Sequence, residues 1–182
     1  GSEKKRNLVS SYYDTADLAF KKNGIAYRVR DKGDGSFEAT IKTDRKSSGG
    51  LSERVEINIP LTENAAVLEG FGERGLGFEL TELAPEGVAK LFTVDVVRTT
   101  YLLDLEGAVV ELAVDNGKII ANGGEDPIDE VELELVDGKV EAMLCFAEQV
   151  AKLVTVHKEE RSKFARGLAL IGVESDFTSH KA

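Results

Sequence analysis

Metal-binding and disulfide-forming residues are scarce in this sequence, which has one cysteine, Cys145, and two histidines, His157 and His180. A single cysteine excludes an internal disulfide framework, and three such ligands in all make a zinc site unexpected. No apolar run approaches the roughly 18 residues that a membrane span needs, and no signal peptide is visible. We therefore expect a soluble, cytoplasmic protein with no membrane partner.

Positive charge is also in short supply. The 182 residues include 33 acidic and 23 basic side chains, which gives a net charge of −10 and a pI of about 4.8. Binding to the phosphate backbone of nucleic acids relies on a net basic surface, so we expect no nucleic-acid partner. The length and the 42% apolar content fit one domain with a full core. The oligomeric state, monomer or dimer, stays open.

What the sequence does have is a polar–apolar alternation with a period of two, which is typical of strands with two different faces. Turn signals separate the alternating segments, and those at 32–35 and at Asn116-Gly117 suit the tight hairpins of an antiparallel sheet. The pattern predicts about eight strands. They are 12–14, 25–30, 37–42, 52–59, 96–101, 109–115, 118–120 and 130–135.

Helical spacing is confined to a few segments. Apolar residues at every third or fourth position predict one helix over 140–154 and another over 157–170. Shorter helices are expected over 65–71 and over 86–92, the latter opened by Pro85. The predicted fold class is α+β: an eight-stranded antiparallel β-barrel that forms a tunnel, with helices packed on the outside.

The side chains on the polar face of the predicted strands change from basic to acidic along the chain. A solvated face explains the charges of any one strand, but it explains less well why bases precede acids. Glu130, Glu132 and Glu134 point to one side of one strand and repel each other by roughly 0.2–1 kcal/mol per adjacent pair, which a cation would relieve. The bases are Arg28, Arg30, Lys42, Arg54 and Arg98, and the earlier acids are Glu111 and Asp115.

In a closed barrel these side chains would form a tunnel with a basic wall and an acidic wall. Guanidinium and ammonium groups suit phosphate oxygens, and carboxylates suit Mg²⁺ or Mn²⁺ that is shared with phosphates. The sequence has no GxxxxGK[ST] loop, no GxSxG elbow and no GxGxxG motif after a strand. A short polyphosphate that carries its metal is therefore the favoured ligand.

Several of these segments resemble the CYTH domain of the triphosphate tunnel metalloenzymes. The resemblance runs from Ser11 to about Leu170 in chain order, and two of its segments, Gly-Gly-Leu…Arg-x-Glu and Ser-Lys-x-x-Arg-Gly, are most similar to bacterial inorganic triphosphatases. The segments that carry it are Tyr12–Thr15, Gly24, Tyr27–Arg30, Thr40–Lys42, Ser48–Glu56, Arg98, Glu111–Asp115, Glu130–Leu135 and Ser162–Gly167.

The resemblance implies an activity, metal-dependent hydrolysis of inorganic triphosphate to diphosphate and phosphate, with Mg²⁺ (or Mn²⁺) as cofactor. The phosphate-binding residues that it implies are Arg28, Arg30, Lys42, Arg54, Arg98, Lys163 and Arg166, of which Lys42 and Arg54 would also be catalytic. The implied metal ligands are Glu111, Asp115, Glu130, Glu132 and Glu134.

The start of the chain departs from the family pattern, in which a Glu-x-Glu-x-Lys strand and a helix precede Tyr12. Only Gly1–Ser10 precede it here, and Glu3-Lys4-Lys5 has a different pattern. We expect residues 1–10 to be a tag remnant and incomplete N-terminus, 11–173 to be a CYTH domain without its first strand, and 174–182 to be a tail. Little turnover is therefore expected from these residues alone.

Four functional alternatives stay open. The substrate could be inorganic triphosphate or thiamine triphosphate, or it could be ATP that is cyclised to cyclic AMP. A nucleotide guest would need a pocket for its base at the tunnel mouth, which the sequence does not locate. A non-catalytic polyphosphate-binding module is a third possibility, and a purely structural barrel with a charged lumen is the fourth.

Overall fold

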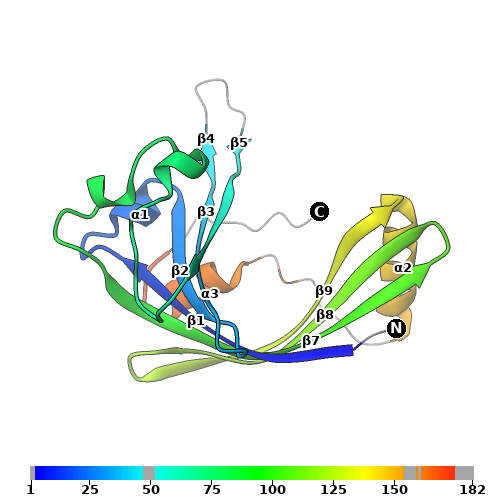
Figure 1. Cartoon of the computed structure of the whole chain (residues 1–182). Helices are drawn as coiled ribbons and strands as arrows, with labels where there is room; N and C mark the ends of the chain where they lie inside the picture. Colours follow the sequence, from blue (N-terminus) through cyan, green and yellow to red (C-terminus); the bar gives the residue numbers. More distant parts are fainter. Residues whose placement is uncertain (1–2, 47–51, 154–158, 160, 175–182) are drawn as a thin grey trace.

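One antiparallel sheet of seven strands organises the chain in a computed structural model that describes residues 3–46, 52–153, 159 and 161–174. The strand order is β6-β3-β2-β1-β7-β8-β9, and β4 and β5 form a separate two-stranded ribbon (Figure 1). The strands are β1 (Glu3–Asp14), β2 (Ile25–Asp31), β3 (Phe37–Thr43), β4 (Arg45–Lys46), β5 (Ser52–Glu53), β6 (Glu56–Leu61), β7 (Ala89–Leu105), β8 (Ala108–Ala121) and β9 (Gly124–Gly138).

The helices are few and short. They are α1 (Ala19–Lys22), α2 (Val140–Leu153) and α3 (Lys163–Leu170), with a π-helical turn η1 (Gly72–Leu76) and a 3₁₀ turn η2 (Leu80–Glu82). No helix in the part of the chain described is long and apolar enough to cross a membrane. The α+β class with an antiparallel sheet is therefore confirmed.

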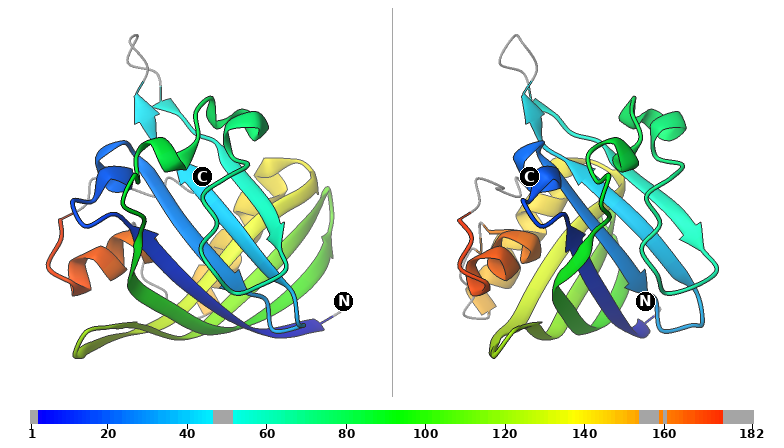
Figure 2. Two further views of the ribbon diagram at one scale, coloured as in Figure 1. Left: turned by 60° about the vertical axis from the view of Figure 1, so that its left-hand side comes forward. Right: turned by 90° about the vertical axis from the view of Figure 1, so that its left-hand side faces the viewer.

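The sheet is curled rather than closed, so the expected eight-stranded barrel is not formed (Figure 2). The right-handed twist of long strands such as β7 and β8, with 17 and 14 residues, bends the sheet into a deep trough. Closure would need the two edge strands to pair, and within the described ranges β6 and β9 do not pair with each other. The polar–apolar alternation along a strand predicts which side chains lie on each face. It does not predict whether the two edge strands of the sheet pair with each other.

The first strand is longer than the sequence pattern indicates. β1 begins at Glu3 and pairs with β7 from Glu3 opposite Tyr101 to Asp14 opposite Ala89. Residues 3–10, which we expected to precede the domain, thus lie in the middle of its sheet. The segment Glu-Lys-Lys-Arg-Asn has no apolar alternation, so periodicity could not reveal this part of the strand.

The predicted hairpin at Asn116-Gly117 is wrong, because β8 continues through both residues as one strand. Gly117 lies opposite Val96 on β7 and Ile128 on β9. A Cβ atom on Gly117 would come within 2.0 Å of the carbonyl oxygen of Asp95. This glycine therefore permits a close approach of two backbones rather than a turn, and the chain turns at Gly123, with a φ of 76°.

The helix predictions hold only in part. α2 confirms the helix expected over 140–154, and α3 lies within the range 157–170, of which 157, 158 and 160 fall outside the described residues. The helix expected over 86–92 is wrong, because β7 begins at Ala89, and the helical turn expected over 65–71 comes later, at η1. The strand expected over 52–59 is divided into β5 and β6.

The unpredicted helix α1 depends on one buried carboxylate. Asp14 accepts hydrogen bonds from the backbone N–H groups of Thr15, Phe20 and Lys21 at 2.7, 2.9 and 3.0 Å. These bonds satisfy donors at the start of the helix that have no partner within it. The Asp14 of the Tyr-Tyr-Asp-Thr motif therefore has a structural role here.

Apolar clusters cover the two faces of the sheet differently. On the outer, convex face, α1, η1 and η2 cover Tyr27 and Ile41, and α2 covers Val110. α3 lies inside the trough (Figure 1), on the concave face that carries Arg28, and packs against Phe92. The expectation of helices on the outside thus holds for α1 and α2 and is wrong for α3. We call the concave face of the sheet the inner face.

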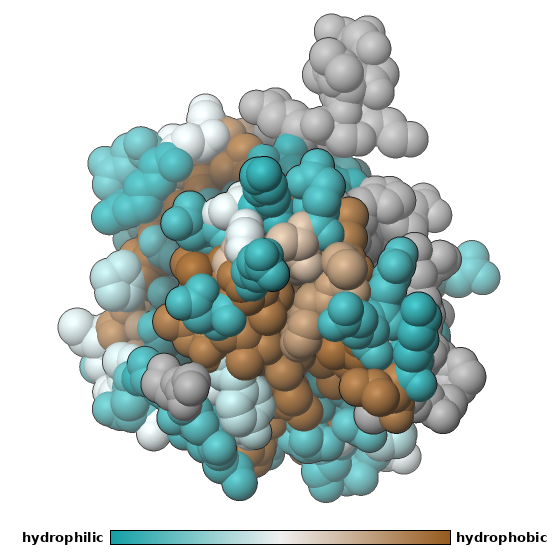
Figure 3. Space-filling view, turned by 90° about the vertical axis from the view of Figure 1, so that its right-hand side faces the viewer, coloured by the Kyte–Doolittle hydropathy of each residue, from teal (hydrophilic) through white to brown (hydrophobic). Residues whose placement is uncertain are grey.

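The side of the molecule on which α2 lies has a broad apolar area (Figure 3). Val136, Val140 and Leu144 are between 44 and 57% exposed. α2 is amphipathic, but only Met143 is fully buried on it, so much of its apolar surface faces solvent.

We predict that Gly117→Ala lowers the free energy of unfolding by about 1–3 kcal/mol, because the added methyl group meets backbone atoms that cannot move aside. Urea unfolding of both proteins measures the change. The matched control is Asn116→Ala, which changes an exposed neighbour and should alter stability by no more than about 0.5 kcal/mol. Equal unfolding midpoints for Gly117→Ala and wild type would contradict the close-approach explanation.

Candidate functional site

The antiparallel register brings the predicted bases and acids to one face. Arg28 lies opposite Tyr12, Arg30 opposite Ser10, and Arg98 opposite Asp115, which in turn lies opposite Glu130. Because side chains alternate faces, these residues and their i±2 neighbours share the inner face. The inner face is therefore basic on β2 and acidic on β8 and β9, as the sequence predicts.

Two further bases come from α3, whose position is fixed by its own sequence. The Ser162 hydroxyl caps the helix by accepting a hydrogen bond from the N–H of Ala165 at 3.0 Å. Gly167 lies so close to the Phe92 ring that a Cβ atom would be 2.2 Å from it. This close packing directs Lys163 and Arg166 toward the acids of β8 and β9.

Lys163 lies among three carboxylates of the inner face. Its Nζ is 2.8 Å from Glu130 Oε2, 3.0 Å from Asp115 Oδ2 and 3.7 Å from Glu132 Oε1. Burial favours the neutral amine, but these carboxylates outweigh it and raise the pKa of Lys163 above its ordinary value. The cation that relieves the repulsion between Glu130 and Glu132 is thus a lysine of this chain.

Arg166 anchors the same helix to β9. Its Nη1 donates to Glu130 Oε1 at 2.6 Å, and its Nε donates to Asp126 Oδ2 at 3.2 Å. Its Nη2 donates to the carbonyl oxygen of Pro127 at 2.7 Å. Arg166 is itself buried, so most of its donors are committed to the protein.

Asp115 is the most deeply buried acid of the site, at 1% exposed. Arg98 donates two hydrogen bonds to it, from Nε at 2.7 Å and from Nη2 at 2.8 Å. Burial raises the pKa of Asp115, but Arg98 and Lys163 outweigh this effect and hold it below the ordinary value. Asp115 is therefore a charged structural link between β7, β8 and α3.

The basic side of the site is arranged in the opposite way, because Arg28 and Arg30 have no carboxylate partner among the residues described. Arg30 Nε donates to the Ser10 hydroxyl at 2.7 Å, and burial together with the charge of Arg28 lowers the pKa of Arg30 to about 10. Arg28 Nε is buried and has no hydrogen-bond partner within the described ranges. At neutral pH Arg30 stays protonated, and with Arg28 beside it this part of the inner face has excess positive charge.

Tyr12 lies beneath these two arginines. Its ring stacks on Phe92 with 4.9 Å between centroids. Burial disfavours its phenolate, but Arg28, Arg30 and Lys42 outweigh this effect and lower the pKa of Tyr12. The lowered pKa reports the same excess of positive charge.

The structure places Lys42 and Arg54 differently from each other. Lys42 lies on β3, opposite Ala26 and Glu56, and its charge reaches Tyr12. Arg54 lies in the link between β5 and β6, exposed, with Nε 3.9 Å from Asp44 Oδ1. Lys42 therefore shares the inner face with the other bases, whereas Arg54 lies beyond the end of the sheet.

The five expected metal ligands share the inner face of β8 and β9, but they do not form a ready metal site. Within the described ranges, no three Asp, Glu, His or Cys side chains are grouped so that they could hold a metal ion. Asp115 and Glu130 are already ion-paired with α3. Mg²⁺ is often held by one or two carboxylates together with substrate phosphates. Glu111 and Glu134, which lie opposite each other on β8 and β9, fit a metal ion of that kind.

Sequence reasoning missed five charged residues that lie on or beside this face: Lys4, Arg6, Lys32, Glu38 and Asp126. Arg6 lies opposite Arg98, and both line a cavity of about 210 Å³ together with Lys4, Arg30, Lys32 and Glu38. Asp126 is four residues before Glu130, so parity alone could have placed it on the inner face. Lys4 and Arg6 share the parity of Tyr12, but the strand was expected to start after them.

Comparison with known proteins places the fold and site in a family. Residues 1–168 match the family model of the CYTH domain, so the chain belongs to the CYTH domain family. This confirms the resemblance seen in the sequence. The inorganic triphosphatase of Haemophilus influenzae is 33% identical over 163 residues, which are 90% of this chain and 46% of that protein. The chain thus spans about half the length of this relative.

Solved structures share the fold at low sequence identity. HpAC1 from Hippeastrum superposes with a TM-score of 0.55 and 18% identity, over 95% of this chain and 85% of that one. The PH1819 protein of Pyrococcus horikoshii gives a TM-score of 0.52 and 22% identity, over 91% and 85% of the two chains. These similarities show that the chain shares its fold with both of these solved structures.

We predict that Asp115→Asn lowers stability by about 3 kcal/mol at pH 7, because Arg98 and Lys163, which are half-buried, lose the buried carboxylate that they share. The pKa of Asp115 is lower in the folded state, so its contribution is complete above the ordinary pKa of about 4 and is lost as the pH falls below it. Urea unfolding between pH 7 and pH 2.5 should therefore show the two proteins converging. Glu125→Gln, which breaks the exposed pair with Lys118, is the control and should cost less than about 1 kcal/mol. A difference that stays constant with pH would contradict the assigned role.

Proposed function

We propose that this chain binds inorganic triphosphate on its inner face and hydrolyses it to diphosphate and phosphate with the help of a divalent cation. The observation that carries the proposal is the pair of half-buried arginines, Arg28 and Arg30, which form no ion pair with a carboxylate in the part of the chain described, where the buried Nε of Arg28 also has no hydrogen-bond partner. Buried charges are normally paired. An anionic ligand with several oxygens supplies the missing partners, and guanidinium groups match phosphate oxygens in geometry.

Two relatives support the choice of triphosphate. The similar protein of Haemophilus influenzae is named an inorganic triphosphatase, and HpAC1 from Hippeastrum is described as having a dominant triphosphatase activity. Arg98, Lys163 and Arg166 extend the basic groups of the site toward β8 and β9. Because most of their donors bind acids of the protein, we assign them mainly to holding the site in shape, with phosphate as a further partner.

The reaction transfers a phosphoryl group to water. The water oxygen forms a bond to the terminal phosphorus, the bond from that phosphorus to the bridging oxygen breaks, and diphosphate leaves with the electron pair. Arg28 and Arg30 stabilise the charge that develops on the transferring and leaving groups, and Lys42 and Arg54 would contact the terminal phosphoryl group. Glu111 and Glu134, which lie opposite each other, would hold Mg²⁺ or Mn²⁺ together with phosphate oxygens, and the cation would neutralise part of the ligand charge.

A second candidate function is polyphosphate binding without hydrolysis. It is favoured by the ion pairs of Asp115 and Glu130, which leave fewer carboxylates for a metal ion. The two candidates share the basic half of the site and differ in whether the acidic half supports turnover. One assay therefore separates them.

We predict that calorimetry detects tripolyphosphate binding in the presence of Mg²⁺ and that Arg28→Ala weakens it at least tenfold, because a charge-assisted contact of roughly 1.5–3 kcal/mol is lost. Lys90→Ala is the matched control: Lys90 is exposed and lies opposite Tyr13, away from the inner face. Equal affinities of wild type and Arg28→Ala would contradict the proposed site.

Phosphate release then tests catalysis. Release that depends on Mg²⁺ or Mn²⁺ and falls in Glu111→Gln supports hydrolysis, whereas binding without release supports the second candidate. Faster turnover of ATP, with cyclic AMP as product, or of thiamine triphosphate would show that inorganic triphosphate is not the preferred substrate. Full activity without a divalent cation would contradict the assignment of the carboxylates.

A further inference from the structure

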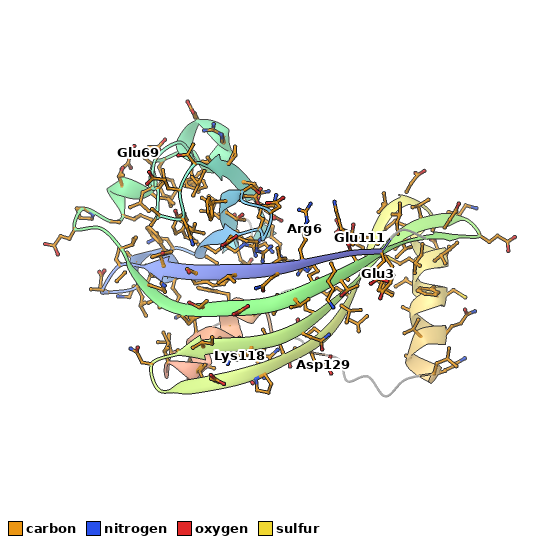
Figure 4. All side chains as sticks on the ribbon, turned by 60° about the horizontal axis from the view of Figure 1, so that its bottom comes forward. Glu3, Arg6, Glu69, Glu111, Lys118 and Asp129 are labelled. Atoms are coloured by element: carbon orange, nitrogen blue, oxygen red, sulfur yellow. The ribbon has the colours of Figure 1, made fainter. Side chains whose placement is uncertain are left out.

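A second group of cations lies beside the triphosphate site. Lys4, Arg6 and Lys32 line the cavity of about 210 Å³, and Arg30 and Arg98 line its side toward the proposed site. Arg6 lies between the β2–β3–β6 part of the sheet and the ends of β7–β9 near α2 (Figure 4). The cavity therefore continues the inner face in the direction away from α3.

The strand register fixes the order of these cations. Along β2, Arg28 and Arg30 follow one another on one face at a step of about 7 Å, and Lys32, which comes directly after the end of β2, lines the cavity together with Arg30. On β1, Arg6 lies opposite Arg98, and Lys4 lies opposite Thr100. The result is a continuous row of cations that is longer than the group assigned to triphosphate.

The charges around the cavity are not balanced. Among its described ionisable lining residues five are basic, and Glu38 is the single acid. Arg6 Nη1 is 3.2 Å from Asp34 Oδ2, and Lys32 Nζ is 3.9 Å from Glu38 Oε2, with side chains between 27 and 40% exposed. Half-exposed pairs of this kind contribute little, typically about 0–1 kcal/mol, so their cations can turn to a ligand at small cost.

The cations of the cavity differ from those of α3 in their burial and in their carboxylate partners. Lys163 and Arg166 are largely buried and lie within 3.0 Å of buried or half-buried carboxylates, whereas the cavity cations have weaker and more exposed partners. The cavity lining also contains no aromatic ring among the residues described, so it offers no surface on which a nucleobase would stack. Its chemistry fits phosphate groups.

We propose that this cavity is an additional phosphate subsite, which extends the triphosphate site so that the chain binds linear polyphosphates of four or more phosphates more tightly than triphosphate. This inference rests on the proposed function, because the longer ligand must first occupy Arg28 and Arg30. The subsite consists of Lys4, Arg6 and Lys32, and Arg30 and Arg98 are shared by both parts. It determines chain-length preference and not the chemical step.

The experiment compares the affinities of tripolyphosphate, tetrapolyphosphate and long-chain polyphosphate by calorimetry in the wild-type chain and in the double variant Arg6→Ala, Lys32→Ala. We expect the wild type to bind tetrapolyphosphate about tenfold more tightly than tripolyphosphate, as one added charge-assisted contact allows. The double variant should bring this ratio close to one.

Lys118→Ala is the matched control. It removes another exposed cation with a carboxylate partner, Glu125 at 3.0 Å, and it should leave the ratio as in the wild type. Thermal unfolding of each variant checks that the fold is kept. If the double variant fails to fold, Lys4→Ala takes its place, because Lys4 is exposed near the chain start.

The possible failures are distinguishable. No binding of tripolyphosphate by the wild type would overturn the proposed function itself. Binding of tripolyphosphate with a wild-type ratio near one, or with a ratio that the cavity variants leave unchanged, would overturn the subsite alone. ATP binding that is as tight as tetrapolyphosphate binding and is lost in the double variant would show that the cavity takes a nucleoside instead.

Discussion

The buried contact between Asp115, Arg98 and Lys163 is the interaction on which the site depends. It joins β7, β8 and α3 around a carboxylate that is only 1% exposed and that would be costly to bury without its cations. Lys163 also reaches Glu130, which Arg166 holds from the other side. The short helix is thereby fixed to the inner face by charge as well as by the packing of Gly167 on Phe92.

This network divides the inner face into two halves with different tasks. On the side of α3, acids and bases neutralise one another, so the arrangement is rigid and has little charge left for a ligand. On the side of β1 and β2, Arg28, Arg30 and the cavity cations have serine, tyrosine or half-exposed acids as neighbours. The division gives a preorganised basic surface, supported from behind by structure that does not have to move when an anion binds.

The sequence predicts the faces of strands well and their ends and connections poorly. Alternation correctly places Arg28 and Arg30, and also Glu130 and Glu132, because parity along a strand is a local property. It fails at Gly117, where a glycine needed for close backbone approach has the same appearance as a turn. It also fails at β1, because the polar residues 3–7 carry no apolar signal, although they pair with β7. Long-range pairing decides both cases.

The position of α3 could not be predicted for a related reason. Its spacing gives an amphipathic helix, which is normally assigned to the outside of a sheet whose inner face is charged. Phe164 and Leu168 instead pack with Tyr12 and Phe92 in an apolar part of the inner face, which also includes Val94 and Ile119. Seeing this from sequence would require knowing that the inner face changes from polar to apolar along β1 and β7.

The opposite signs of the whole chain and of the basic half of its inner face have a kinetic consequence. At a distance, a polyanion meets a protein of net charge −10 and is repelled. Only within about one Debye length, about 10 Å at 0.1 M salt, does the positive charge on the basic half of the trough dominate. Added salt therefore acts on the two rate constants separately: it screens the repulsion and speeds the encounter, and it weakens the contacts in the trough and speeds departure. For this molecule, the association rate constant and the lifetime of the complex therefore need not change in the same direction when salt is added.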